Sequence, residues 1–208
     1  MAALPQIKTN MNKIDLNALR DRAYKIACDH GFHDAELSNE HCLMLVITEL
    51  SEAVEADRKL KYANRKVFEE IIKIPHRDYA SKESIWSSHF ETYIKDTIED
   101  ELSDAVIRLL DLAGMRDIDL ELAIVDFNSD TIGDMAEACK DETFTESIYD
   151  ISVLAERYKG LYDFTTIVND MLLSILGLAK HLNIDLMWHI EQKMKYNELR
   201  KKMHGKKY

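Results

Sequence analysis

Apolar side chains recur every three or four residues along most of the chain, the spacing that places them on one face of an α-helix. No clear run shows the alternation of apolar and polar positions that is typical of a half-buried strand. The pattern therefore predicts an all-α protein folded as a helical bundle. Its predicted helices span residues 15–30, 39–62, 88–114, 118–140, 143–160, 163–182 and 185–203. The stretch between the second and third helices, which holds Pro75 and Trp86, is expected to be partly irregular.

The helix predicted at 39–62 carries acids in an unfavourable position. With residues placed at about 100° steps, its core stripe consists of Leu43, Val46, Ile47, Leu50 and Val54. Glu49 falls among the apolar residues that widen this stripe, Glu52 lies at their edge, and Glu55 lies opposite. A carboxylate beside an apolar face is costly unless a cation pairs with it. We therefore expect Glu49 to have a cationic partner, either a basic side chain or a metal ion.

A second pair of acids, Glu101 and Asp104, has the same three-residue spacing beside the core stripe of the helix predicted at 88–114. If the two helices pack together, four carboxylates converge, and their repulsion favours a divalent cation. Ligation by oxygen alone suits Mg²⁺, or Mn²⁺ in its place, rather than zinc. The alternative of two solvated faces with ordinary salt bridges stays open on spacing alone.

A di-iron carboxylate centre is the competing metal site on a helical bundle, and it requires Glu-x-x-His pairs. None of the eight histidines has a glutamate three residues before it. The sequence therefore disfavours a di-iron centre.

The C-terminal segment is strongly basic, although the net charge of the whole chain is −11. Seven Lys or Arg residues lie between 193 and 207. In the helix predicted at 185–203, Lys193, Asn197 and Arg200 fall close to one face. Such a cluster of donors suits a polyphosphate, but cations near a helix C-terminus also complement the helix dipole. The tail taken alone favours the dipole interpretation.

Two segments of the chain resemble two later segments. "LLDLAGMRDIDL" at 109–120 resembles "ILGLAKHLNIDL" at 175–186, and "ITELSEA" at 47–53 loosely matches "IGDMAEA" at 132–138. Self-similarity of this kind predicts a duplicated unit. Chance similarity between short helical patterns is the alternative.

The duplication predicts a single all-α domain made of two pseudo-symmetric halves. Its predicted extent is 1–208, with a first half at 15–127, a degenerate second half at 128–208 and an insertion around 63–87. The second half would carry Asp134, Glu137 and Asp170. Ile167 stands where an equivalent of Glu101 is required, so that second site is expected to be degenerate.

The composition excludes several classes of protein. The net charge of −11 disfavours general binding to nucleic acids or to anionic membranes. No stretch approaches the roughly 18 apolar residues of a membrane span, and the first residues lack the apolar run of a signal peptide. Cys28, Cys42 and Cys139 are odd in number and widely spaced, which suits free thiols in a reducing compartment. We therefore expect a cytoplasmic protein.

The acidic motifs and the basic ending together resemble the MazG-like all-α nucleoside triphosphate pyrophosphohydrolases, which are related to the dimeric all-α dUTPases. The family pattern of Glu-x-x-Glu and then Glu-x-x-Asp is matched by "ELSE" (Glu49, Glu52) and "ELSD" (Glu101, Asp104). The ending "KMKYNELRKKMHGKKY" resembles the family's Lys-x-x-x-Asn-x-x-Arg pattern followed by Gly-Lys. Two features depart from the family: the long separation of the two acidic motifs, and a basic tail that follows the second half.

The resemblance implies hydrolysis of a nucleoside triphosphate to the monophosphate and pyrophosphate, with Mg²⁺ as cofactor. The catalytic and metal-binding residues would be Glu49, Glu52, Glu101 and Asp104, and the substrate-binding residues would be Lys193, Asn197, Arg200, Arg108, Phe32 and His33. Arg108 could contact a phosphate or Asp104, and we favour the salt bridge with Asp104. Phe32 and His33 would border the base pocket, unless they only anchor their loop.

Two other functions stay open: a non-catalytic nucleotide sensor on the same fold, and a helical interaction protein that needs no metal. The protein would be a monomer with an internal pseudo-dyad or a homodimer. Each half lacks what the other keeps, since the first has the full set of acids and the second has the basic ending. We therefore expect a composite site, with the C-terminal helix packed against the acidic helices.

Overall fold

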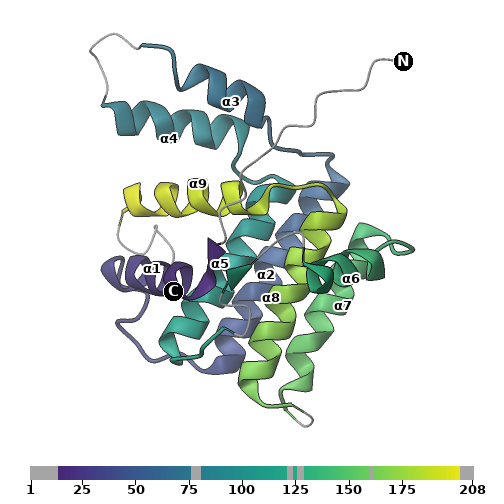
Figure 1. Cartoon of the computed structure of the whole chain (residues 1–208). Coiled ribbons are helices and arrows are strands. Elements are labelled where there is room, and N and C mark those ends of the chain that lie inside the picture. The colour runs from purple at the N-terminus through teal and green to yellow at the C-terminus, as the bar shows by residue number, and fades with distance from the viewer. Residues whose placement is uncertain (1–13, 76–80, 121–123, 126–128, 160–161, 202–208) are drawn as a thin grey trace, which may run out of the picture.

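The computed structural model describes residues 14–75, 81–120, 124–125, 129–159 and 162–201. Over this part of the chain, nine helices pack into an all-α bundle, as the sequence predicted (Figure 1). They are α1 (Leu16–Asp29), α2 (Asn39–Arg58), α3 (Arg65–Ile71), α4 (Lys82–Tyr93), α5 (Ile98–Met115), α6 (Asp130–Ala138), α7 (Phe144–Arg157), α8 (Phe164–His181) and α9 (Leu186–Leu199). Two-residue strands β1 (Ile14–Asp15) and β2 (Ile124–Val125) form one antiparallel pair that apolar periodicity could not predict.

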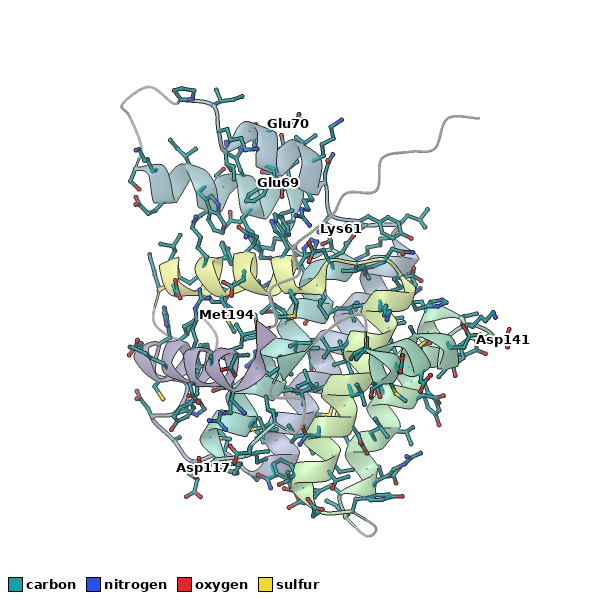
Figure 2. The ribbon with its side chains drawn as sticks, in the orientation of Figure 1. Lys61, Glu69, Glu70, Asp117, Asp141 and Met194 are labelled. Carbon is teal, nitrogen blue, oxygen red and sulfur yellow. The ribbon has the colours of Figure 1, made fainter. Side chains whose placement is uncertain are left out.

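Helices α2, α5, α7 and α8 form the centre of the bundle, α1 and α9 pack on α5, and α6 packs on α8 (Figure 1). Their apolar sides share one large core. Met194 of α9 is fully buried in this core, whereas Glu69 and Glu70 lie on α3, beyond α9 (Figure 2). The C-terminal helix therefore lies directly against α5, the helix that carries two of the predicted acids. Within the described residues, no single helix is long and apolar enough to cross a membrane, and only α8 and α9 as a bent pair meet that length and composition.

Side chains and backbone geometry set two helix boundaries that periodicity predicted wrongly. The helix predicted at 88–114 is divided into α4 and α5, because Thr97 caps α5 and Asp96 adopts a left-handed backbone with φ of 56°. In the region predicted as a helix over 118–140, the described residues are helical only in α6, which begins at Asp130 after its cap Ser129 and ends at Ala138. The acids of α5 therefore begin within the first turn of a new helix rather than in the middle of a long one.

The insertion around 63–87 contains α3 and the start of α4, which pack together as a helical hairpin. It has a small aromatic core of its own, in which Phe68, Trp86 and Phe90 meet Tyr196 of α9. Residues 76–80 of the insertion lie outside the described part of the chain. The hairpin covers the side of α9 that faces away from α1 (Figure 1).

A glycine of α8 permits the close approach of α6. A Cβ added at Gly177 would lie 2.3 Å from Met135 Cβ and 2.9 Å from the Met135 carbonyl carbon. We expect Gly177→Ala to lower the free energy of unfolding by about 1–3 kcal/mol, because the two helices must move apart. Gly133 is a matched control, since its added Cβ would meet only Lys180 Nζ at 3.7 Å. Urea unfolding should show no loss for Gly133→Ala, and equal losses in both variants would contradict the close packing.

Candidate active site

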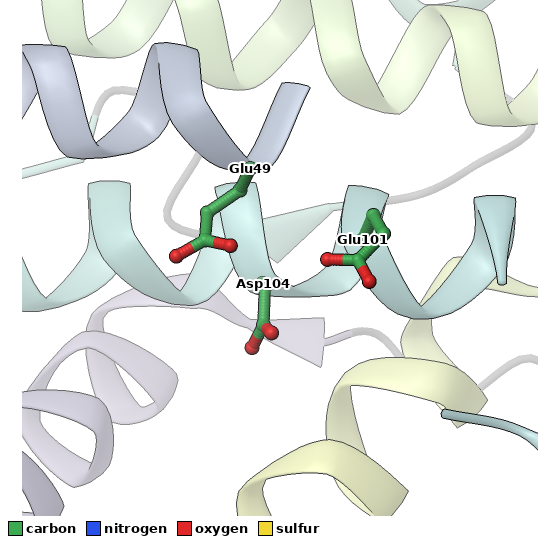
Figure 3. Close-up of side chains that lie close together, drawn as sticks. All are labelled: Glu49, Glu101 and Asp104. Atoms are coloured by element: carbon green, nitrogen blue, oxygen red, sulfur yellow. The ribbon is translucent and has the colours of Figure 1, made fainter. Parts of the chain in front are cut away.

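Helices α2 and α5 bring three of the four predicted acids together. One carboxylate oxygen from each of Glu49, Glu101 and Asp104 lies within 4.8 Å of the others, and the three side chains converge in Figure 3. The i, i+3 spacing puts Glu101 and Asp104 on neighbouring turns of one side of α5. Glu49 and Glu101 are each only 4% exposed, whereas Asp104 is half-buried. Three oxygen donors at this spacing have the geometry to bind a divalent cation.

The fourth predicted acid, Glu52, lies outside this trio. It is exposed on α2 and lines a neighbouring hollow together with Glu101, Lys59 and Asp96. The charge of Glu52 still helps to raise the pKa of Glu101. A second trio with the same 4.8 Å limit consists of Asp96, Asp100 and Glu101. The acids therefore centre on Glu101, which belongs to both groups.

Two basic side chains neutralise part of this negative charge. Lys193 Nζ of α9 lies 2.7 Å from Oδ2 of Asp100 and 2.7 Å from Oδ2 of Asp104. Arg108 Nε donates to Glu49 Oε1 at 3.0 Å, so the favoured pairing of Arg108 with Asp104 was wrong. Arg108 reaches across to α2, and Lys193 from α9 takes the place beside Asp104. The Lys193 ammonium is already paired with two acids, and Lys193 does not line the cleft as a phosphate ligand would.

Glu101 is the acid that these cations leave uncompensated. Within the described residues, its carboxyl forms no ion pair with a basic side chain. Burial, and then the charges of Asp104 and Asp100, raise the pKa of Glu101 to about 9. Burial also raises the pKa of Asp100 to about 6, although Lys193 opposes that change. The folded protein therefore keeps a proton on Glu101 at neutral pH unless another cation binds.

An open cleft lies beside the acids, between α1, α2, α5 and the end of α9. Its polar lining consists of Glu49, Asp104, Arg108, Asp111, Asn197 and Arg200. Asn197 is 8% exposed and its Oδ1 has no hydrogen-bond partner in the described structure. Buried polar atoms are seldom left unpaired, so this one fits a cleft that takes a polar ligand. The enclosed volume of about 60 Å³ is small beside the roughly 300–1,000 Å³ of ordinary ligand pockets. A nucleotide would therefore extend out of the cleft.

The two residues predicted to border a base pocket lie at this cleft and behind it. Phe32 lines the cleft, and His33 lines an adjoining hollow. His33 Nε2 lies 2.7 Å from Asp111 Oδ1, and the centroid of the His33 ring lies 5.0 Å from that of Tyr24. His189, one turn before Lys193 on α9, does not line the cleft, and burial followed by the charge of Arg65 lowers its pKa to about 4.

Sequence reasoning missed two acids of this site, Asp100 and Asp111. Asp111 follows Asp104 by seven residues, which puts both on one side of a helix, so the spacing offered a signal. Asp100 offered none, because its ion pair joins it to Lys193, 93 residues further along the chain.

The second site, which the duplication predicted to be degenerate, forms no cluster of acids among the described residues. Asp134 and Glu137 are exposed on α6, and Asp170 is exposed on α8. Ile167 is fully buried in the core. None of these acids belongs to a metal-type cluster of the described residues.

No known protein family, curated protein or solved structure that we searched matches the chain. The likeness to the MazG-like enzymes therefore rests on the sequence motifs alone. The all-α class rests on the structure.

The buried Glu101 predicts an unusual dependence of stability on pH. The carboxyl ionises near 4.5 in the unfolded chain and near 9 in the folded one, so the folded state holds one more proton between these values. Its contribution to stability is therefore complete below about 4.5 and is lost as the pH rises towards 9. Urea unfolding of the metal-free protein should show this fall, and Glu101→Gln should remove it. An equally steep fall in the variant would contradict the assignment.

Proposed function

We propose that the protein is an Mg²⁺-dependent hydrolase that converts a nucleoside triphosphate and water into the monophosphate and pyrophosphate. The observation that carries the proposal is Glu101, a buried carboxyl beside Glu49 and Asp104 that forms no ion pair among the residues the structure describes. Burying a carboxylate is costly unless a cation pairs with it. The motifs that supply these three acids are those of the MazG-like enzymes, and this likeness supports the choice of reaction.

The donor set fits a hard divalent cation. Glu49, Glu101 and Asp104 would hold it through carboxylate oxygens, the ligand type that Mg²⁺ and Mn²⁺ prefer. Three acids leave coordination positions for waters and phosphate oxygens, which Mg²⁺ usually keeps. The bound ion would supply positive charge to the phosphates and acidify a water for attack. Glu52 borders the hollow on the outer side of Glu101 and would assist from there.

The basic and amide groups take two different roles in this proposal. Lys193 is a positioning residue, because its ion pairs hold Asp104 in place. Arg108 holds Glu49 of α2 in place through its own ion pair. Asn197 of α9 and Arg200, which directly follows the helix, line the cleft, so they are the groups that would contact the phosphate chain. The site is composite in this sense, since its acids come from α2 and α5 and its C-terminal groups come from α9.

We also propose that the bundle is a duplicated unit in which α2 and α5 correspond to α6 and α8, the helices that carry the two pairs of similar segments. In both pairs the first helix packs on the second. Helices α5 and α8 end with the same backbone hydrogen bonds around a left-handed residue, Asp117 and Asn183, which fall on each other when 109–120 is matched with 175–186. Helix α2 ends in a similar way at Leu60, so the helix packing supports the proposal more strongly than the cap does.

The test of the proposed function is the identity of the products. The protein is incubated with Mg²⁺ and each common ribonucleoside and deoxyribonucleoside triphosphate, and the products are separated by chromatography. We expect monophosphate and pyrophosphate, and no product once the metal is chelated. Diphosphate with orthophosphate would reject this reaction class. Triphosphate binding without any product would instead support the nucleotide sensor, and the absence of both would support the interaction protein.

A further inference from the structure

The far end of the cleft carries an acid that the proposed hydrolysis does not use. Asp111 lies seven residues after Asp104 on α5, which is about 10.5 Å along a helix that rises ~1.5 Å per residue. Both acids line the same cleft, and its lining also includes the apolar side chains of Ala27, Phe32 and Ile107. The lining of the cleft thus combines acids of the metal-type cluster, an apolar wall and, two turns further along α5, a separate hydrogen-bonding group. A nucleotide has the same order of phosphate, flat ring faces and polar base edge.

His33 restrains the carboxylate of Asp111. The ring nitrogen Nε2 lies 2.7 Å from Oδ1, and the Asp111 side chain is 19% exposed. Within the described part of the chain, its other oxygen, Oδ2, takes part in no side-chain hydrogen bond or ion pair. Asp111 lines the cleft on one side and the hollow behind it, where His33 lies, on the other. The protein therefore holds one oxygen of a carboxylate that lines the cleft, and the other oxygen has no side-chain partner among the described residues.

We propose that Asp111 determines base specificity and selects guanine, an inference that rests on the proposed function for its substrate class. A carboxylate only accepts hydrogen bonds. Guanine presents a ring N–H and an amino group side by side, so both can donate to one carboxylate. Adenine and cytosine place a ring-nitrogen lone pair beside their amino group, and uracil and thymine flank a single N–H with two carbonyls. These lone pairs repel a carboxylate, which makes discrimination against the other bases part of the same contact.

The competing interpretation is that His33 and Asp111 only tie the loop after α1 to α5. Such a tie would hold the loop equally well whatever base is bound, so it predicts no effect on base preference. If the Asp111 carboxylate instead contacts the base, the preference among bases should change when its hydrogen-bond acceptors are altered. Asp111→Asn makes this change with little change of shape, because an amide offers one acceptor and one donor group.

The experiment measures kcat/KM with GTP and ATP for the wild type, Asp111→Asn and Asp119→Asn. We expect the wild type to favour GTP by roughly 10–100-fold, the value of one good bidentate contact to a base. Asp111→Asn should lose this preference, since its amide suits the adenine edge. Asp119 is a matched control because it is 97% exposed and pairs only with Arg20 among the described residues, so its variant should keep the preference. Equal use of both substrates by the wild type, or an unchanged preference in Asp111→Asn, would overturn the inference.

Binding separates this inference from a failure of the proposed function. GMP and AMP are titrated calorimetrically into the wild-type protein, which requires neither hydrolysis nor a variant. Tighter binding of GMP by roughly 10–100-fold supports guanine selection even if no triphosphate is hydrolysed, in which case only the proposed reaction fails. Equal binding of GMP and AMP, or binding of neither, overturns the role of Asp111.

Discussion

Replacement of Lys193 by methionine is expected to lower the free energy of unfolding by about 3–5 kcal/mol, the usual cost of removing one partner from a buried ion pair. The side chain is 3% exposed, and its ammonium lies 2.7 Å from oxygens of both Asp100 and Asp104. Methionine keeps the length and most of the packing of the lysine chain, but it leaves the two acids without their cation. Denaturant unfolding at neutral pH, in the absence of divalent ions, measures the loss.

Lys195, two residues along α9, provides a matched control. It is exposed and lies over the ring of Trp86 at 4.1 Å, so Lys195→Met should cost no more than about 1 kcal/mol. Adding Asp100→Asn to Lys193→Met should recover part of the lost stability, because it removes one uncompensated charge. If the effects of Lys193→Met and Asp100→Asn simply add, or if the two lysine variants lose equal stability, the buried ion pairs are not the cause.

Glu101→Gln is expected to separate activity from stability. Turnover should fall by roughly 10²–10³-fold, comparable to the loss of one group that acts on transition-state charge. At mildly alkaline pH, the metal-free variant should be more stable than the wild type. The raised pKa of Glu101, about 9, forces the wild type to take up a proton on folding, and glutamine has no such requirement. Steady-state pyrophosphate release and urea unfolding measure the two effects.

Glu70→Gln is the control for this variant, because Glu70 is exposed on α3 in the hairpin (Figure 2). It should change neither turnover nor stability beyond about 0.5 kcal/mol. A Glu101→Gln variant that loses stability along with activity would indicate a structural role for the carboxyl. Near-normal turnover would remove Glu101 from the proposed active site.

The helical class and the burial of Glu49 could be predicted because both depend on neighbours along one helix. The angular position of Glu49 among Leu50 and Ala53 was enough to place it at an apolar face, and it is 4% exposed. The same reasoning placed Glu101 and Asp104 on one side of α5. Glu52 stood at the edge of the apolar face in the sequence, and it is exposed in the structure.

The remaining features depend on contacts that periodicity does not contain. The break between α4 and α5 follows from the Thr97 cap and the left-handed Asp96, while Ile94 and Ile98 continue the apolar pattern across it. The partners of Lys193 come from a helix about 90 residues earlier, so a spacing argument could place the lysine on a face but could not choose acids over phosphate as its contact. Its burial decides this, because a buried ammonium needs its counter-ions within the protein.

Calorimetric titration of the metal-free protein with Mg²⁺ tests most directly whether the acids around Glu101 bind a divalent cation. Because the pKa of Glu101 is raised to about 9, the carboxyl is protonated at neutral pH and must release its proton to bind the ion. Titrations in buffers of different ionisation enthalpy should therefore show saturable binding with about one proton released per ion. Both the binding and the proton release should be lost in Glu101→Gln and kept in Glu70→Gln. Unchanged binding in Glu101→Gln, or no binding to the wild type at millimolar Mg²⁺, would contradict the metal site.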